Sequence, residues 1–312
     1  MVSAVLRMGT RGSPLALRQA QALSDLLAAT HPELALRGAI ETVVVRTSGD
    51  RMIDRSLAEV GGKGLFVKEI EEALLAGSID LAVHSMKDVP TRLPDRLAIG
   101  CYLKREDPRD AFLSLLASSL AALPQGASVG TSSLRRKAQL LYARPDLRIL
   151  PLRGNVDTRL RKLADGVVDA TLLAFAGLKR LEKEAHATVV LAPDEMLPAP
   201  AQGAIGVEIR ADDARARRYL APLDDAATAL CVTAERALLA ALDGSCRTPI
   251  AALATLAGDR LVLDGMIIAP DGRARHQHRC EGDKTAAEAI GFAAGETLRS
   301  RAGPGFFAGL AR

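Results

Sequence analysis

Short apolar segments alternate with helix-like segments through the middle of this chain of 312 residues. This alternation is typical of consecutive βαβ units, and it therefore predicts a mostly parallel sheet with helices packed against it. Strands are expected near residues 128–129 and at 147–150 and 170–173, and helices are expected at 134–142, 156–164 and 176–184.

An apolar strand runs directly into a group of reactive side chains between Leu81 and Thr91. Residues 81–83 are the expected end of a buried strand, and Pro90 prevents it from continuing. Open α/β sheets bind ligands at the carboxyl ends of their strands, which favours a functional site here. A loop that points its charges into water is the alternative. The side chains at this strand end are His84, Ser85, Lys87 and Asp88.

The composition predicts a soluble globular protein. Apolar residues make up 48% of the chain and charged residues 25%, and no apolar run approaches the roughly 20 residues that span a membrane. Because residues 1–7 lack the pattern of an export signal, we expect a cytoplasmic protein without a membrane partner. The cysteines form no CxxC pair, so neither a zinc site nor a disulfide framework is predicted. They are Cys101, Cys231, Cys246 and Cys280.

Positive charge is concentrated between Ser128 and Lys162, although the net charge of the whole chain is only +4. A local cationic field suits DNA, RNA or a small polyanion. The chain has three Tyr, six Phe and no Trp to stack on bases, so binding to single-stranded nucleic acid is disfavoured. The basic residues here are Arg135, Arg136, Lys137, Arg144, Arg148, Arg153, Arg159, Arg161 and Lys162, against Asp146 and Asp157.

Two glycine-containing turns open helices and are candidate anion sites. In the first, Ser13 is the expected N-cap and Pro14 the first helical residue, with Arg11 just before them. In the second, residues 130–133 precede an Arg-Arg pair. The N–H groups of a helix start bind anions, so two similar domains with such starts would hold an anionic ligand. Ordinary capped helices with surface arginines are the alternative.

The remaining elements are separated by polar or proline-containing stretches. Residues 46–62 lack apolar periodicity and are expected to form a long mobile loop. The segments 104–110 and 196–208 are expected crossovers between domains, the second leading into a strand. Further strands are expected at 5–8, 40–45 and 93–103, and a helix at 65–75.

The last part of the chain is predicted to be a small α+β domain. On its last strand His276 and His278 are two residues apart, and an exposed strand face is favoured over a metal site because no third ligand accompanies them. Cys246 follows a predicted helix and precedes Arg247. A neighbouring cation favours the nucleophilic thiolate, although most lone cysteines are inert. The expected helices are 228–242 and 285–299, and the expected strands are 251–256, 261–268 and 273–280.

Five motifs together resemble the porphobilinogen deaminase (hydroxymethylbilane synthase) family, and they occur in one order over nearly the whole chain. They are HSMKDVP at 84–90, GTSSLRR at 130–136, LRGNV at 152–156, QGA at 202–204 and the loop of Cys246. The resemblance implies two α/β domains like periplasmic binding proteins, joined by two crossovers, and a smaller C-terminal α+β domain. The implied domains are 1–103 with 204–221, then 109–197, then 226–312.

The resemblance also implies the reaction. Family members join four porphobilinogen molecules stepwise to a dipyrromethane cofactor, which a thioether holds on a cysteine. Ammonia is lost at each step, and hydrolysis then releases the linear tetrapyrrole 1-hydroxymethylbilane. Here the cysteine would be Cys246. Asp88 would be the catalytic residue, since it would stabilise the cationic azafulvene formed on deamination and assist proton transfers.

The other implied site residues form two sets, and no metal is implied. Because each pyrrole carries two carboxylates, the growing chain is a polyanion that requires many cations. A monomer is implied, which passes its product to uroporphyrinogen-III synthase. The implied cofactor-binding residues besides Cys246 are Lys87, Asp88, Ser133, Arg135, Arg136 and Gly154. The implied substrate-binding residues are Arg11, Ser13, Phe66, Arg153, Arg159, Arg180 and Gln202.

Two departures from the family pattern and two rival functions stay open at this point. Glu59 stands where the family often has Lys, and Ser245, Cys246 and Arg247 replace a common Gly-Gly-Cys-Gln. A solute-binding protein without catalysis would also bind an anion, but such proteins normally carry an export signal, and the cysteine loop would have no role. A nucleic-acid-binding protein would suit the charge but not the shortage of aromatic residues.

Overall fold

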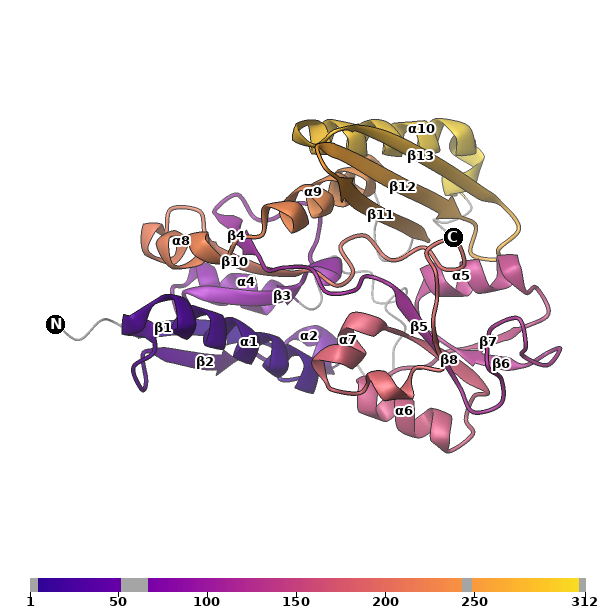
Figure 1. Ribbon diagram of the computed structural model, residues 1–312, viewed down its shortest axis with the longest axis horizontal. Helices are drawn as coiled ribbons and strands as arrows, with labels where there is room; N and C mark the ends of the chain where they lie inside the picture. Colours follow the sequence, from indigo (N-terminus) through magenta and orange to yellow (C-terminus); the bar gives the residue numbers. More distant parts are fainter. Residues whose placement is uncertain (1–4, 52–66, 243–248, 309–312) are drawn as a thin grey trace. The chain divides into compact units, whose positions relative to one another are not determined.

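The computed structural model of the chain describes residues 5–51, 67–242 and 249–308 (Figure 1). The chain divides into two compact units, residues 1–106 with 204–229 and residues 107–203 with 230–312. The first unit contains a five-stranded sheet, and the second contains another five-stranded sheet and a three-stranded sheet. This combination confirms the expected fold class of two α/β sheets with a smaller C-terminal α+β part.

The sheet of the first unit has the strand order β2-β1-β3-β10-β4. β1 pairs in parallel with β2 and β3, while β10 runs antiparallel to β3 and β4. The strands are β1 (Leu6–Thr10), β2 (Ile40–Val44), β3 (Leu81–Ser85), β4 (Leu97–Tyr102) and β10 (Ile205–Arg210). The helices are α1 (Pro14–Thr30), α2 (Ser48–Arg51), α4 (Lys68–Leu75) and α8 (Ala214–Leu220), with 3-10 turns η1 (Pro32–Leu34), η2 (Met86–Asp88) and η4 (Ala221–Leu223).

The five-stranded sheet of the second unit, β7-β6-β8-β5-β9, has the same arrangement and directions of strands, although β5 comes first along the chain and its counterpart β10 comes last. β6 pairs in parallel with β7 and β8, and β5 is antiparallel to β8 and β9. β6 therefore occupies the place of β1, which explains why similar turns follow these two strands. The strands are β5 (Asp110–Ser114), β6 (Ser128–Gly130), β7 (Arg148–Leu150), β8 (Ala170–Ala174) and β9 (Val189–Val190). The helices are α5 (Leu134–Ala143), α6 (Val156–Ala164) and α7 (Phe175–Arg180), with the 3-10 turn η3 (Glu184–His186).

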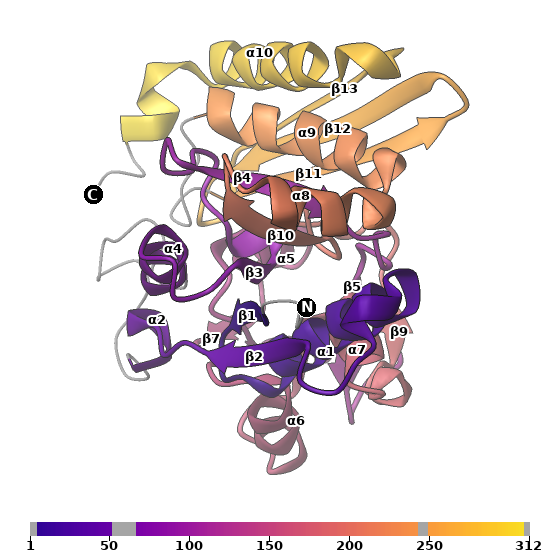
Figure 2. The same cartoon turned by 90° about the vertical axis from the view of Figure 1, so that its left-hand side faces the viewer.

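The C-terminal sheet is antiparallel, and two helices share a core with it. The helices run side by side (Figure 2) because glycines bring their backbones together. A Cβ at Gly291 would collide with the carbonyl of Ala234, and one at Gly295 would lie 2.8 Å from the carbonyl oxygen of Leu238. The elements are α9 (Ala226–Ala241), β11 (Ile250–Ala257), β12 (Arg260–Ile268), β13 (Arg275–Asp283), η5 (Lys284–Ala286) and α10 (Ala287–Ala308).

Several details differ from the sequence predictions. Residues 48–51 form α2 instead of a loop, and residues 52–62 of that predicted loop lie outside the described residues. Asp110 begins β5, where only a crossover was expected. His276 and His278 are both half-buried, and His276 packs edge-on against Phe306 of α10, so the prediction of an exposed strand face is wrong.

The sequence also raised the questions of a membrane span and a metal site. In the described parts of the chain, no helix has the length and apolar character to span a membrane. No group of three or more His, Cys, Asp or Glu side chains suitable for a metal ion occurs among the same residues.

Candidate active site

Asp88 lies on the 3-10 turn η2, directly after the carboxyl end of β3. Met86 begins this turn with its side chain in the core, at 1% exposure. Its N–H donates to the carbonyl of Ala204 at 3.0 Å, just before β10. Lys87 and Asp88 on the same turn are exposed. The predicted strand and its polar end are thus confirmed, except that His84 is buried.

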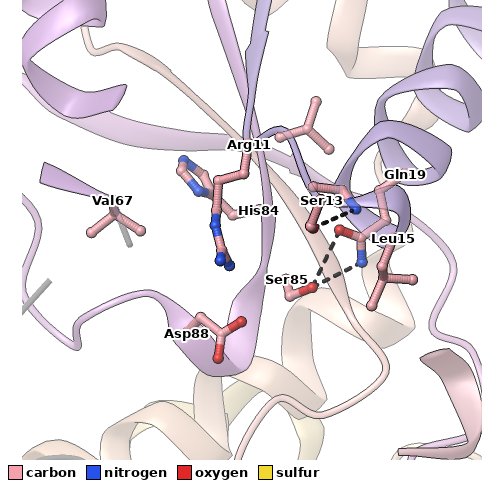
Figure 3. A pocket seen from close by; sticks show the side chains of 10 residues that line it. Arg11, Ser13, Leu15, Gln19, Val67, His84, Ser85 and Asp88 are labelled. Carbon is pink, nitrogen blue, oxygen red and sulfur yellow. Dashed lines mark hydrogen bonds between the residues drawn. The ribbon is translucent and has the colours of Figure 1, made fainter. Parts of the chain in front are cut away.

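A pocket of about 70 Å³ lies beside Asp88, between the first turns of α1 and the end of β3 (Figure 3). In Figure 3 the guanidinium group of Arg11 extends towards the carboxylate of Asp88. The structure therefore brings the predicted residues Arg11, Ser13 and Asp88 around one pocket. Its polar lining residues are Arg11, Ser13, Gln19, His84, Ser85 and Asp88.

Hydrogen bonds fix the walls of this pocket. Ser13 Oγ accepts from the N–H of Ala16 at 3.3 Å and caps α1. Gln19 Nε2 donates to Ser85 Oγ at 2.8 Å, and Ser85 Oγ donates back to Gln19 Oε1 at 3.3 Å. The helix is thereby tied to the end of β3. Its positively polarised start lies beside Arg11, which suits an anionic ligand.

In the second unit a buried aspartate holds two of the predicted arginines. Asp110 is 0% exposed, and its oxygens accept bonds from Arg135 Nη2 and Arg136 Nη2, each at 2.7 Å. Gln202 Nε2 donates to Asp110 Oδ1 at 2.8 Å. The three predicted residues are therefore gathered around a carboxylate that was not predicted. Each guanidinium also donates to a backbone carbonyl, Arg135 to Leu197 and Arg136 to Leu172.

The charges of this cluster do not cancel. Burial alone would raise the pKa of Asp110, but the charges of Arg135 and Arg136, with bonds from Arg136 and Gln202, hold that pKa well below its usual range. Burial lowers the pKa of Arg135, and the nearby Asp110 offsets this only in part. Two guanidinium charges against one carboxylate leave one positive charge. The Nε atoms of both arginines are buried without a hydrogen-bond partner among the described residues, so two donors suit a carboxylate ligand.

The start of α6 gathers three further predicted residues. Asn155 caps the helix through its Oδ1, which accepts from the N–H of Thr158 at 2.9 Å. Gly154 has φ +116°, and a Cβ there would lie 2.6 Å from Thr158 Cγ2, so this turn requires glycine. Arg159 Nε donates to the carbonyl of Gly154 at 2.8 Å. Arg153, directly before this turn, is half-buried.

The remaining predicted residues are distributed as follows. Ser133 caps α5 and accepts from the N–H of Arg136 at 3.4 Å. Arg180 ends α7, and its Nη2 donates to the carbonyl of Gly203 at 2.6 Å. Cys246 and Phe66 lie outside the described residues, as do Glu59, Ser245 and Arg247.

Sequence reasoning missed Asp110. It follows Pro108 and Arg109 in a run of charged residues, which resembles a solvated linker. The signal that identifies it is the apolar sequence Ala111–Leu113 that comes next, because an acid at the start of a buried strand needs a partner. Glu208, buried inside β10, was missed in the same way.

The fold and these sites define an α/β protein with an arginine and an exposed carboxylate at one pocket of the first unit and two arginines around a buried carboxylate in the second. A family model described as "Porphobilinogen deaminase, dipyromethane cofactor binding domain" matches residues 6–218. Another, described as "Porphobilinogen deaminase, C-terminal domain", matches residues 229–300. The chain belongs to the porphobilinogen deaminase family.

Two relatives match this chain over nearly its full length. The chain is 57% identical over 302 residues to porphobilinogen deaminase of Paracoccus denitrificans, covering 97% of this chain and 96% of that protein. It is 54% identical over 309 residues to chloroplastic porphobilinogen deaminase of Pisum sativum, covering 98% and 84%. A solved periplasmic substrate-binding protein of an ABC transporter from Coxiella burnetii has 15% identity and a TM-score of 0.45, covering 72% of this chain and 94% of that chain.

The family fixes the reaction. The chain has hydroxymethylbilane synthase activity, a transferase reaction of porphyrin and heme biosynthesis that condenses porphobilinogen with loss of ammonia. Its cofactor is dipyrromethane, because residues 6–218 match the domain that binds this group.

Proposed function

We propose that Asp88 is the catalytic carboxylate of this transferase and that the pocket beside it binds porphobilinogen. The observation that carries the proposal is that Arg11, Ser13 and Asp88 line one pocket at the carboxyl end of a parallel strand. Arg11 and the start of α1 suit the carboxylates of the substrate. Asp88 supplies an exposed acid beside them.

Asp88 acts on charge that develops during deamination. When ammonia leaves porphobilinogen, the carbon that carried it becomes electron-poor and the pyrrole becomes cationic. A carboxylate about 4 Å away stabilises a unit positive charge by about 4 kcal/mol at an effective dielectric near 20. The same carboxyl group delivers a proton to the departing amine and later accepts the proton lost from the ring carbon.

Four arginines are proposed to bind the carboxylates of the substrate and of the growing chain. Bonds to backbone carbonyls support this role for two of them, because the carbonyls of Gly154 and Gly203 fix where their guanidinium groups lie. Gln202 is 1% exposed, and it donates to Asp110, the carboxylate that also holds Arg135 and Arg136. The proposed substrate-binding residues are Arg11, Ser13, Phe66, Arg153, Arg159, Arg180 and Gln202.

The residues of the second unit fit the dipyrromethane cofactor. Its pyrroles carry carboxylates, and the buried Nε–H groups of Arg135 and Arg136 are donors without a described partner in a cluster of net positive charge. When bound, the cofactor supplies the pyrrole carbon to which the first substrate is joined. We propose that Cys246 holds it by a thioether. The other proposed cofactor-binding residues are Lys87 and Asp88 in the first unit and Ser133, Arg135, Arg136 and Gly154 in the second.

The proposal includes the domain organisation. The three separate sheets support a division into domains 1–103 with 204–221, 109–197 and 226–312.

We also propose a cytoplasmic monomer that passes its product to uroporphyrinogen-III synthase. This handover follows from the reaction, since the product is a linear tetrapyrrole that must be closed to give a porphyrin.

Intact mass spectrometry of freshly purified holoprotein, followed by peptide mapping, tests the attachment. We expect the added mass of a dipyrromethane on the peptide that contains Cys246. The variant Cys246→Ser should carry no added mass, whereas the control Cys280→Ser, at a half-buried thiol of β13, should retain it. An unmodified Cys246 in active holoprotein would contradict the proposal.

A further inference from the structure

A buried histidine–glutamate pair lies next to the turn that carries Asp88. His84 belongs to β3 and Glu208 to β10. His84 Nε2 lies 3.0 Å from Glu208 Oε2, and the two side chains are 4% and 0% exposed. The proposed reaction uses neither residue, although His84 also lines the pocket.

The strand register explains how the two side chains meet. β3 and β10 are antiparallel, with His84 opposite Gly206 and Glu208 opposite Ala82. The pair is therefore diagonal on one face of the sheet, within reach of long side chains. The side chain of Met86 also packs on β10, because a Cβ at Gly206 would collide with its Sδ. The position of the Asp88 turn thus depends on how β3 lies against β10.

The pair is electrostatically demanding. A buried carboxylate is costly unless it is bonded, and removal of its partner leaves the full penalty. Glu208 Oε1 has no hydrogen-bond partner within residues 5–51, 67–242 and 249–308, so the bond from His84 to Oε2 matters all the more. Glu71 of α4 lies close to the pair: burial, and then the charge of Glu208, raise the pKa of Glu71, while His84 opposes the effect of Glu208. Because the remaining buried group would lack its partner, loss of either His84 or Glu208 should shift the end of β3.

We propose that His84 and Glu208 are positioning residues, whose hydrogen bond sets the place of the Asp88 carboxylate by holding β3 against β10. The inference rests on the catalytic role proposed for Asp88. A displaced carboxylate loses contact with charge that exists only in the transition state, so kcat should fall without a matching rise in KM.

Kinetics of holoenzyme variants test the inference. Glu208→Gln and His84→Gln should each lower kcat about tenfold or more and leave KM within about twofold. The double variant should lose less than the product of the single losses, because two amides bond to each other without a buried charge. In an Asp88→Asn background, Glu208→Gln should lower the residual rate no further. The control His31→Gln removes another imidazole of the same unit, bonded to the carbonyl of Tyr219 at 2.9 Å, and should leave kcat unchanged.

Two outcomes would overturn the inference. The first is that the single variants lower the melting temperature but leave kcat at the parental value. The second is that Glu208→Gln costs the same factor whether or not the Asp88 carboxylate is present. Parental activity of Asp88→Asn alone would instead remove the role of Asp88 itself, so the two failures are distinguishable. If Glu208→Gln does not fold, His84→Gln measured in both backgrounds decides by the same comparison.

Discussion

The two five-stranded sheets have the same arrangement of strands, but the aspartates at the ends of their middle strands differ in burial and pairing. β3 in the first sheet and β8 in the second occupy corresponding places. Asp88 follows β3 on an exposed turn. Asp110 pairs with Ala174, the last residue of β8, and is 0% exposed between two guanidinium groups.

Because Asp110 is buried and Asp88 is exposed, we expect Asp110 to contribute mainly to stability and Asp88 mainly to the reaction. A buried carboxylate persists only when it is paired, so the oxygens of Asp110 are committed to Arg135, Arg136 and Gln202. An exposed carboxylate has little desolvation cost and can act on a ligand. Substitution of Asp110 should therefore change mainly stability, and substitution of Asp88 mainly turnover.

Asp110→Asn should give the largest loss of stability. The substitution leaves the charges of Arg135 and Arg136 buried without a counter-charge, which costs about 3–5 kcal/mol in the free energy of unfolding. Denaturant unfolding of the holoenzyme measures this loss. Asp146→Asn is the matched control, because Asp146 also accepts two bonds from an arginine, Arg144, but its side chain is 25% exposed. Equal losses of stability in the two variants would contradict this prediction, because the burial of Asp110 would then add nothing to the cost.

The pH dependence of the free energy of unfolding tests the role of Asp110 further. The pKa of Asp110 in the folded protein lies below the value of about 3.9 expected in the unfolded chain. Its stabilisation is therefore fully present above about pH 4 and is lost as the pH falls towards the folded pKa. The stability difference between the parent and Asp110→Asn should be constant from neutral pH to about pH 4 and shrink below it. A difference that shrank near neutral pH would point to another group.

Gly154→Ala should cost less, about 1–3 kcal/mol in the free energy of unfolding. The residue has φ +116°, and a Cβ would lie 2.6 Å from Thr158 Cγ2. Gly166→Ala is the matched control, because Gly166 has φ +69° with nothing within 4 Å, and it should show only backbone strain of about 1 kcal/mol. Denaturant unfolding measures both variants. Equal losses would mean that the side chain of Thr158 moves aside without cost.

Local periodicity was sufficient to predict the elements that pack one apolar face against a core. The helix predicted at 156–164 coincides with α6, and the one predicted at 134–142 ends one residue before α5 does. The neighbourhood of Asp88 was predictable for a related reason, because an apolar strand, polar residues and a proline follow one another within a single short segment.

Asp110 was not predictable from local pattern. Its two arginines lie 25 and 26 positions away in the sequence, so only the folded sheet shows that the acid is buried and paired. β9 has two residues, which is too short to show a period. The burial of Asp110 and the short strand β9 depend on contacts between residues far apart in the sequence, which a short stretch of sequence does not show.

Asp88→Asn should have the smallest effect on stability, within about 0.5 kcal/mol, because the side chain is exposed and the amide has nearly the same shape. Its kcat should nevertheless fall about 100-fold or more, since the amide offers no negative charge to the cationic pyrrole. Steady-state kinetics and denaturant unfolding of the same preparation measure both effects. Asp95→Asn, at another exposed acid of the first unit, should change neither. If Asp88→Asn unfolded as readily as Asp110→Asn, the two aspartates would not differ in the way their burial predicts, and parental turnover would exclude Asp88 from the reaction.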